Sequence, residues 1–146
     1  MKVILLNGSP KSKGCTYTAL KIIEKELINE GIEVKFYEVG NKPVIGCIGC
    51  NGCRKLGKCI HNDLVNEVSK EMESADGFII GSPVHYASAS GAVTSFLDRL
   101  FYSTDKNYLR HMFAASVVSC RRGGASAAFD QLNKYFTINE MPIVSS

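Results

Sequence analysis

Two short apolar runs in this sequence end in the same tripeptide: Val3-Ile4-Leu5-Leu6-Asn7-Gly8-Ser9-Pro10 and Phe78-Ile79-Ile80-Gly81-Ser82-Pro83. A solid apolar run of this length indicates a strand buried on both faces, and Gly, Ser and Pro indicate the loop that follows it. In a parallel α/β sheet, a ligand binds beyond the carboxyl ends of two strands whose connections run in opposite directions. We therefore expect the two loops to form one cleft that holds a small phosphorylated cofactor.

The rest of the chain alternates between helix and strand patterns. From Thr16 to Glu30 apolar residues recur at helical spacing, whereas Ile32 to Phe36 alternates with period two, as in a strand with one wetter face at the sheet margin. Further helices are expected after a cap at Asn62 or Asp63, over Ser90 to Phe101 and over Ala125 to Phe136, and further strands over Gly77 to Ile80, over Phe113 to Val118 and from Pro142. This alternation predicts an α/β fold with a doubly wound parallel sheet and residues 1–146 as one domain. For the sheet we expect the order 2-1-3-4-5, which is one of the common orders of doubly wound sheets.

Composition limits the classes of protein to which the chain can belong. With 146 residues, 45% of them apolar, it can bury one core. Its net charge of +3, from 17 basic and 14 acidic residues without long runs of one sign, favours neither a nucleic-acid partner nor a membrane surface. No signal-peptide pattern precedes the first strand, and no apolar stretch nears the ~20 residues that span a bilayer. We therefore expect a cytoplasmic protein whose six cysteines are thiols or metal ligands rather than disulfides.

The sequence stops soon after the fifth expected strand begins at Pro142. A doubly wound sheet needs a covering layer on both faces, and a last strand without a following helix leaves part of one face bare. We therefore expect either that the last strand and helix are missing from a truncated chain, or that a partner covers the gap.

The first loop carries groups that hold a phosphate. The stretch Ser9-Pro10-Lys11-Ser12-Lys13-Gly14-Cys15-Thr16 places hydroxyls and two ammonium groups before a helix, whose free amides and positive dipole end stabilise an anion. It is not the nucleotide-triphosphate loop, because Cys15 rather than a lysine follows Gly14, and the Gly-x-Gly-x-x-Gly dinucleotide spacing is missing. A monophosphate fits better, and the alternative is a surface turn rich in Ser and Lys.

The second loop, Pro83-Val84-His85-Tyr86-Ala87-Ser88-Ala89-Ser90, combines small residues with an aromatic pair. It suits the edge of a flat ring such as an isoalloxazine, held by backbone amides and apolar contacts. The alternative is an ordinary strand-to-helix connection in which Tyr86 packs. A third loop, Ser119 to Gly124, follows the fourth expected strand. The three loops are expected to converge on one site, as a flavin requires.

Four of the six cysteines form one compact segment, Cys47-x-x-Cys50-x-x-Cys53-x-x-x-x-x-Cys59. Glycines between them let the backbone wrap tightly. Two-residue gaps between successive cysteines are typical of [4Fe-4S] ligation, whereas structural zinc sites generally use two separated Cys-x-x-Cys pairs. The spacing favours a cluster, with a zinc site and free or oxidised thiols as alternatives. Cys120 lies apart, and we expect it to pack within its loop.

The histidines and the neighbours Asp98 and Arg99 suggest no catalytic site. His61, His85 and His111 lack the spacing of a metal triad, and only His85 lies near the expected cleft. Asp98 and Arg99 are expected to form an ion pair at the end of their helix.

These motifs together resemble the NAD(P)H-dependent FMN reductases of flavodoxin-like fold and, within them, the iron-sulfur flavoproteins. The resemblance covers nearly the whole chain and is carried by Asn7-Gly8-Ser9-Pro10-Lys11, by Gly81-Ser82-Pro83-Val84-His85-Tyr86 and by the cysteine segment. It implies an FMN-binding domain with a cysteine-rich insertion at about residues 46–60. The residues that it implies for FMN are Ser9, Lys11, Gly14, Cys15 and Thr16 at the phosphate, Pro83, Val84, His85 and Tyr86 at the ring and ribityl chain, and Ser119 and Gly124 at the far end. For an iron-sulfur cluster it implies Cys47, Cys50, Cys53 and Cys59.

The resemblance also implies a function. The flavin passes electrons from NADH or NADPH to an acceptor such as a quinone, a flavin, a ferredoxin or an oxygen species, and no side-chain acid or base is obligatory. A [4Fe-4S] cluster, if the cysteines hold one, divides the two-electron load into single-electron steps. A second subunit commonly completes the flavin site in this family, so we expect a homodimer or homotetramer. The alternatives are a non-catalytic FMN-binding or thiol redox-sensing module and a nucleotide-binding interaction domain without flavin.

Overall fold

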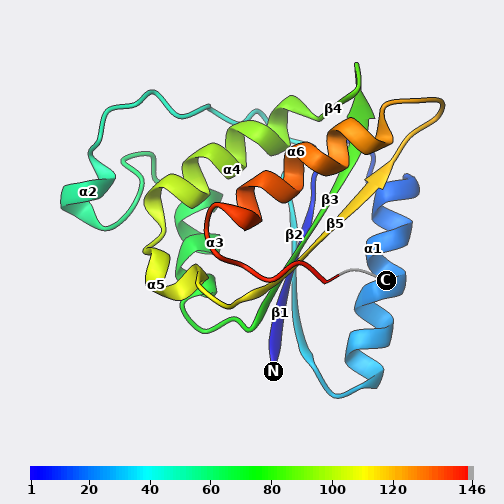
Figure 1. The fold of residues 1–146 in the computed structure, drawn as a ribbon, viewed down its shortest axis with the longest axis horizontal. Helices are drawn as coiled ribbons and strands as arrows, with labels where there is room; N and C mark the ends of the chain where they lie inside the picture. Colours follow the sequence, from blue (N-terminus) through cyan, green and yellow to red (C-terminus); the bar gives the residue numbers. More distant parts are fainter. Residues whose placement is uncertain (145–146) are drawn as a thin grey trace.

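The computed structural model describes residues 1–144, which form a parallel sheet with helices on both faces (Figure 1). The strands are β1 (Lys2–Asn7), β2 (Glu33–Glu38), β3 (Gly77–His85), β4 (Ser88–Ala89) and β5 (Phe113–Ser119). The helices are α1 (Cys15–Asn29), α2 (Cys53–Leu56), α3 (Leu64–Met72), α4 (Gly91–Ser103), α5 (Lys106–Leu109) and α6 (Ala125–Thr137).

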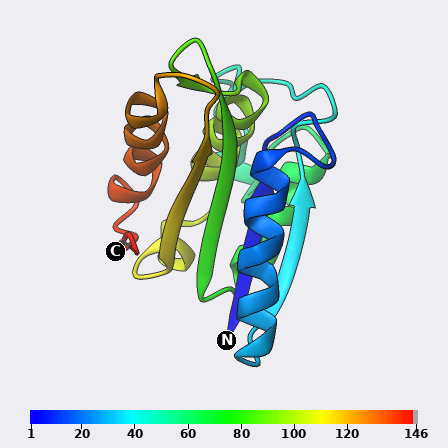
Figure 2. The same cartoon turned by 90° about the vertical axis from the view of Figure 1, so that its right-hand side faces the viewer.

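The main sheet has the order β2-β1-β3-β5, with every neighbouring pair parallel (Figure 2). This confirms the expected order, in which β5 is the fourth strand of the sheet. The fifth expected strand is reduced to one parallel bridge between Ala114 and Ile143, in which the Ala114 amide donates to Pro142 and the Ala114 carbonyl accepts from Val144.

The burial of each strand follows its apolar pattern. In β1 the side chains of Ile4, Leu5 and Leu6 are fully buried, because the strand has neighbours on both edges and helices on both faces. Strand β2 pairs with β1 alone and alternates between exposed and half-buried residues at its start, as expected for a marginal strand. Of the two expected caps of α3, Asp63 is the one used, since its carboxylate accepts a hydrogen bond from the Val65 amide at 3.1 Å.

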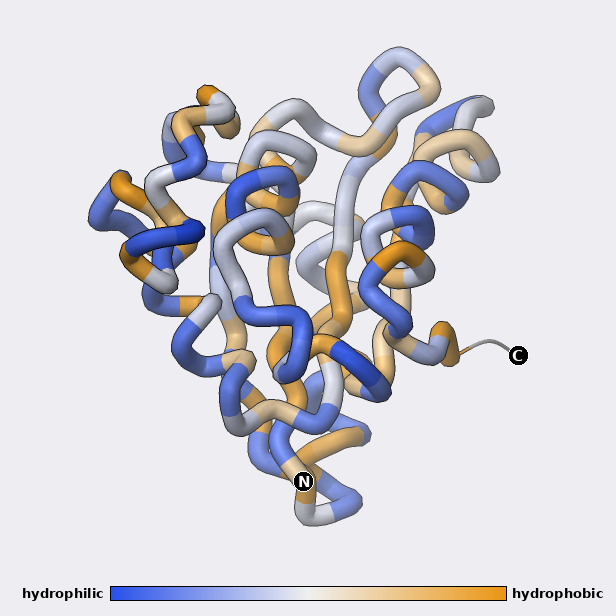
Figure 3. The backbone as a smooth tube through the Cα atoms, turned by 60° about the vertical axis from the view of Figure 1, so that its left-hand side comes forward, coloured by the Kyte–Doolittle hydropathy of each residue, from blue (hydrophilic) through white to orange (hydrophobic). Residues whose placement is uncertain are grey.

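The larger core lies between the sheet and helices α3, α4 and α6, while α1 covers the opposite face (Figure 1). Phe78 of β3, Phe101 of α4 and Phe136 of α6 meet there edge to face, with ring centroids 6.0 to 6.3 Å apart. Figure 3 shows hydrophobic residues concentrated in the central strands, with hydrophilic residues in the segments around them. No helix among residues 1–144 has both the length and the apolar character needed to cross a membrane.

The face covered by α1 is open over β5. Ala114 belongs to the larger core, so its neighbour Phe113 points to the α1 face, where it is 52% exposed. Ala115 and Val117, which share this face, are only half-buried. On this face the sheet is therefore less well covered at β5 than at β1.

Strand β3 is longer than the sequence predicts. The expected strand ends at Ile80, whereas β3 continues through Pro83 to His85. Its pairing with β5 extends to the register Pro83–Ser119, while β1 ends opposite Gly81. Pro83, which has no amide hydrogen, therefore lies where one edge of β3 no longer has a strand beside it, a position that proline tolerates.

Candidate functional site

The two Gly-Ser-Pro segments lie directly against each other. The Gly8 amide donates to the Gly81 carbonyl at 2.8 Å, and the Ser90 hydroxyl donates to the Gly8 carbonyl at 3.0 Å. A side chain cannot be placed at Gly8 without a clash, because an added Cβ would lie 1.9 Å from Val93 Cγ2. The close approach of the two loops places both at the carboxyl edge of the sheet, where the strand order reverses.

A cavity of about 370 Å³ opens between these loops, and we call it the switch-point pocket. Its lining consists of Ser9, Pro10, Lys11, Gly14, Cys15, Thr16, Pro83, Val84, His85, Ser119, Cys120 and Arg121. Nine of the eleven residues expected to hold FMN are in this lining, and they come from the three loops that follow β1, β3 and β5.

The other two expected residues, Tyr86 and Gly124, do not line this cavity. Tyr86 lies at the tip of the turn between β3 and β4, with a φ of +51° and a fully exposed ring. Gly124 packs closely against that turn, since a Cβ at this position would lie 2.6 Å from Ala87 Cα. Its φ of +90° is also a conformation that favours glycine.

One hydrogen bond joins the first turn of α1, which follows the loop after β1, to the end of β5. The hydroxyl oxygens of Thr16 and Ser119 are 2.6 Å apart, and the Thr16 side chain is almost fully buried. Ser9, also buried, accepts from the Lys11 amide at 3.1 Å, which sets the shape of the loop. The pocket therefore presents hydroxyls whose positions are fixed by bonds within the protein.

The electrostatics of the pocket favour an anion. Helix α1 begins after Gly14, which supplies no side-chain cap, so no side chain competes for the amides of its first turn. The first turn contains no acidic residue, and the lining of the pocket contains none either. Lys11 and Arg121 add two positive charges. These groups fit a phosphate, and the strand and turn residues from Pro83 to His85 fit the flat part of an FMN molecule.

Three lining residues were not expected from the sequence: Pro10, Cys120 and Arg121. Cys120 was expected to pack within its loop; its thiol does donate to the Arg122 carbonyl at 3.5 Å, but the residue is exposed and lines the pocket. The signal that could have found Arg121 is its place two residues after Ser119, in the loop that ends β5.

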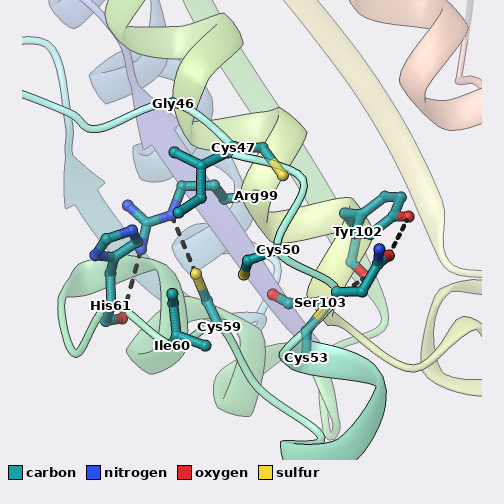
Figure 4. A pocket seen from close by; sticks show the side chains of 12 residues that line it. Gly46, Cys47, Cys50, Cys53, Cys59, Ile60, His61, Arg99, Tyr102 and Ser103 are labelled. Carbon is teal, nitrogen blue, oxygen red and sulfur yellow. Dashed lines mark hydrogen bonds between the residues drawn. The ribbon is translucent and has the colours of Figure 1, made fainter.

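The cysteine segment forms a second, much smaller cavity of about 20 Å³, which we call the cysteine pocket (Figure 4). Its lining consists of Gly46, Cys47, Ile48, Cys50, Asn51, Cys53, Cys59, Ile60, His61, Arg99, Tyr102 and Ser103. All four cysteines expected to bind a cluster are present, together with three residues of α4. All of these cysteines are free thiols.

Arg99 is the charged residue of this pocket, and its partner is not the expected one. Its guanidinium donates to both carboxylate oxygens of Asp63, at 2.7 and 2.8 Å, and its Nε donates to Cys59 Sγ at 3.2 Å. The expected ion pair between Asp98 and Arg99 is wrong, because successive helical residues point in different directions. Asp98 instead accepts from the Tyr135 hydroxyl at 2.5 Å, and burial together with this bond raises the pKa of Tyr135.

The Arg99 pair shifts the pKa of both partners. Burial by itself lowers the pKa of the Arg99 guanidinium, but its bonds to Asp63 and Cys59 outweigh this and raise the pKa above its ordinary value. Burial likewise raises the pKa of Asp63, and the bonds from Arg99 and from the Val65 amide overcome it, so the pKa falls below its ordinary value. Both groups are therefore charged at neutral pH.

The donor set of the cysteine pocket fits a metal cluster, although the sulfurs do not have a ligating arrangement. Among residues 1–144, no three His, Cys, Asp or Glu side chains are grouped as metal ligands. His61 lines the cavity, and within the same residues its Nε2 is the one buried side-chain nitrogen or oxygen without a hydrogen-bond partner.

Comparison with known proteins agrees with this geometry. The model of the NADPH-dependent FMN reductase family matches residues 1–146. The iron-sulfur flavoprotein MJ1083 of Methanocaldococcus jannaschii is 36% identical over 146 residues, which cover 99% of this chain and 76% of that protein. The iron-sulfur flavoprotein MJ0731 of the same organism is 35% identical, and the alignment covers 97% of this chain and 73% of that protein.

Among solved structures, the apo form of the NADH:FMN oxidoreductase EMOB superposes with a TM-score of 0.74 at 18% identity, covering 99% of this chain and 73% of that one. This likeness concerns the fold, which is flavodoxin-like. The family match extends over both the loop after β1 and the cysteine segment. The chain therefore belongs to the family of NADPH-dependent FMN reductases, whose members are flavin-dependent oxidoreductases.

Proposed function

We propose that this protein binds FMN in the switch-point pocket and passes electrons from NADH or NADPH to a quinone, a flavin, a ferredoxin or an oxygen species. The observation that carries the proposal is the single cavity formed by the loops after β1, β3 and β5, which gathers nine residues expected to contact FMN. The similarity to iron-sulfur flavoproteins and the membership in the FMN reductase family support the same chemistry.

Each group in the pocket has a role in binding. Thr16 and Ser119 share one hydrogen bond, so the hydroxyl that accepts in it keeps its own hydrogen to donate to the phosphate, together with the α1 amides, while Lys11 and Arg121 balance the phosphate charge. The segment from Pro83 to His85 holds the ring edge and limits the access of water to it. When bound, FMN supplies the hydride and electron chemistry, so the side chains bind and orient rather than act as acids or bases.

Two measurements test this proposal. Titration of FMN into the purified protein should quench flavin fluorescence to saturation at one FMN per chain. The loaded protein should then oxidise NADH or NADPH in the presence of excess quinone or ferric acceptor. A protein that stays colourless with added FMN contradicts the proposal and favours a nucleotide-binding interaction domain.

A second candidate is a non-catalytic FMN-binding or thiol redox-sensing module. It is favoured by the free thiols of Cys47, Cys50 and Cys120, which are all exposed and so can react with oxidants. A protein that binds FMN but oxidises neither nicotinamide would support this module over the enzyme.

We further propose that the cysteine pocket holds a [4Fe-4S] cluster through Cys47, Cys50, Cys53 and Cys59. The support is the presence of four thiols in one lining, beside a buried guanidinium and an unpartnered imidazole nitrogen. Replacing all four cysteines by serine should remove iron and the broad visible absorption of anaerobically purified protein while flavin stays bound. The matched control is Cys120→Ser, which changes a thiol outside this pocket and should keep the iron. Iron retained in the quadruple variant contradicts the assignment.

The assembly that we propose is a homodimer or homotetramer in which a second copy covers the open part of the sheet at β5. Phe113, which is half-exposed on this face, is the apolar group that such a contact buries. Light scattering should then give a mass of at least two chains, and Phe113→Glu should lower it. Ile28→Glu, on the exposed side of α1, is the control that leaves the mass unchanged.

A further inference from the structure

Arg99 is the largest charged side chain in the interior of the protein, with 2% of its surface exposed. A buried charge is costly unless it is paired and its donors are satisfied. Arg99 meets this condition through the two-pronged bond to the Asp63 carboxylate and through the Nε bond to Cys59 Sγ. Several hydrogen-bond partners therefore fix the position of the guanidinium.

Two further bonds connect Arg99 to both ends of the cysteine segment. Its Nη1 donates to the Ile45 carbonyl at 3.3 Å, and its Nη2 donates to the His61 carbonyl at 3.4 Å. Ile45 precedes the first of the four cysteines by two residues, and His61 follows Cys59 by two. One side chain from α4 thus holds the backbone at both ends of the cysteine segment.

Cys59 is held at its backbone and at its sulfur by different residues. Asn66 of α3 accepts from the Cys59 amide and donates to its carbonyl, both at 2.9 Å. The sulfur itself is reached by Arg99 Nε at 3.2 Å (Figure 4). Asn66 therefore holds the backbone of Cys59 directly, whereas Arg99 contacts its sulfur and sets the charge environment there.

We propose that Arg99 is a positioning residue of the cysteine pocket, which sets the place of the Cys59 sulfur and donates a hydrogen bond to it when the pocket holds an iron-sulfur cluster. The inference rests on the cluster proposed above. A donor to a ligand sulfur stabilises the more negative, reduced form of a cluster, so the bond raises the reduction potential. Loss of the bond should lower the potential and loosen the segment from Ile45 to His61.

The test compares four single variants of the full chain. Arg99→Met removes every donor but keeps an unbranched side chain of similar length, and Arg99→Lys keeps the charge without the planar set of donors. Asp63→Asn weakens the pair with Arg99 but leaves the Nε donor to Cys59. Arg110→Met is the matched control, because it breaks an exposed arginine–carboxylate pair, with Glu140 at 2.8 Å, on the surface.

Two readouts are measured. Anaerobic spectroelectrochemical titration of the iron chromophore should give a lower midpoint potential for Arg99→Met and Arg99→Lys than for the wild type, Asp63→Asn and Arg110→Met. Hydrogen–deuterium exchange of cluster-free protein should be faster across residues 45–61 in Arg99→Met and unchanged there in Arg110→Met. If Arg99→Met does not fold, the midpoint potential and the hydrogen–deuterium exchange of Arg99→Lys test the inference instead.

Three results overturn the inference. An unchanged potential in both Arg99 variants excludes the sulfur bond, and an equal shift in Asp63→Asn assigns the effect to the fold of the segment alone. Unchanged exchange over residues 45–61 excludes the anchoring role. A wild-type protein that takes up no iron under reconstitution refutes the cluster instead, and the exchange measurement still tests the anchor separately.

Discussion

Thr16 and Ser119 lie 103 positions apart in the sequence, and their hydroxyl oxygens are 2.6 Å apart in the folded protein. The bond joins the first turn of α1 to the last residue of β5. It therefore closes one side of the switch-point pocket and holds two hydroxyls beside Lys11 and Arg121.

The first prediction concerns these hydroxyls. Thr16→Val keeps the shape of a buried side chain and removes its hydroxyl, so FMN affinity should fall roughly 10- to 100-fold, as for the loss of one hydrogen bond to a charged group. Fluorescence titration measures the affinity. Riboflavin, which has no phosphate, should bind equally well to both proteins, and Thr137→Val on α6 should bind FMN like the wild type. A parallel loss of riboflavin affinity would show that Thr16 acts on the ring instead.

A second prediction concerns the turn between β3 and β4. Gly124→Ala should weaken the binding of FMN and riboflavin alike, because the new Cβ would lie 2.6 Å from Ala87 Cα and 3.2 Å from a methyl group of Val84, which lines the pocket. The φ of +90° adds strain. Gly123→Ala is the adjacent control, since nothing lies within 4 Å of a Cβ there. Equal affinities in the two variants contradict the supporting role of Gly124.

A third prediction concerns the contact between the two Gly-Ser-Pro loops. Gly8→Ala should lower the free energy of unfolding by about 1–3 kcal/mol, because overpacking forces Val93 and the Gly81 carbonyl to move. Urea unfolding followed by circular dichroism measures it. Gly91→Ala, where a Cβ meets open space at the start of α4, should leave stability equal or slightly higher. Full stability of Gly8→Ala would mean that the loops can separate at little cost.

A fourth prediction concerns acid stability. The pKa of Asp63 in the folded protein lies below its ordinary value of 3.8, so the carboxylate stabilises the fold at pH values above 3.8. This contribution is lost as the pH falls from 3.8 through the lowered pKa, where the folded protein must take up a proton. Asp63→Asn removes the ionisable group, so its stability should depend less on pH in that window. Unfolding free energies measured from pH 6 down to pH 2 test this.

The same measurement has an internal control. Asp105 caps α5, accepting from the Asn107 amide at 2.9 Å, and forms none of the ion pairs described for residues 1–144. Asp105→Asn is therefore the control, a change of carboxylate to amide that leaves the Arg99–Asp63 pair intact. Parallel stability curves for Asp63→Asn and the wild type would contradict the stabilising role of the Arg99 pair in acid.

Much of the fold was predictable because local patterns decided it. The solid apolar run in β1 and the alternation in β2 predicted a central and a marginal strand, and both are confirmed. Helices α4 and α6 lie within one or two residues of their expected ranges, since each carries an amphipathic repeat. The short α2 and α5 were not predicted, because one turn of helix has no periodicity to recognise.

The sequence predicted which loops form the candidate site, but it predicted less well which side chains line it. The carboxyl ends of parallel strands meet at one edge, so residues after β1, β3 and β5 had to come together. The turn that carries Tyr86 could not be foreseen, because it depends on β3 running past Gly81, paired first with β5 as far as Pro83 and then with the short β4 at Val84 and His85. Arg121 was missed because a loop has no periodic pattern from which the orientation of a charged side chain can be predicted.

The sequence by itself determined which segments become strands and helices, because apolar spacing decides this, and it determined the edge at which the glycine-rich loops gather, because the carboxyl ends of parallel strands share one edge. The strand order was expected from the likeness to flavodoxin-like sheets. The tertiary structure alone decided that Arg99 pairs with Asp63 and Cys59 rather than with its neighbour Asp98. A charge that folding removes from water must bind the groups packed around it, and those groups come from α3 and the cysteine segment, distant in the sequence from α4.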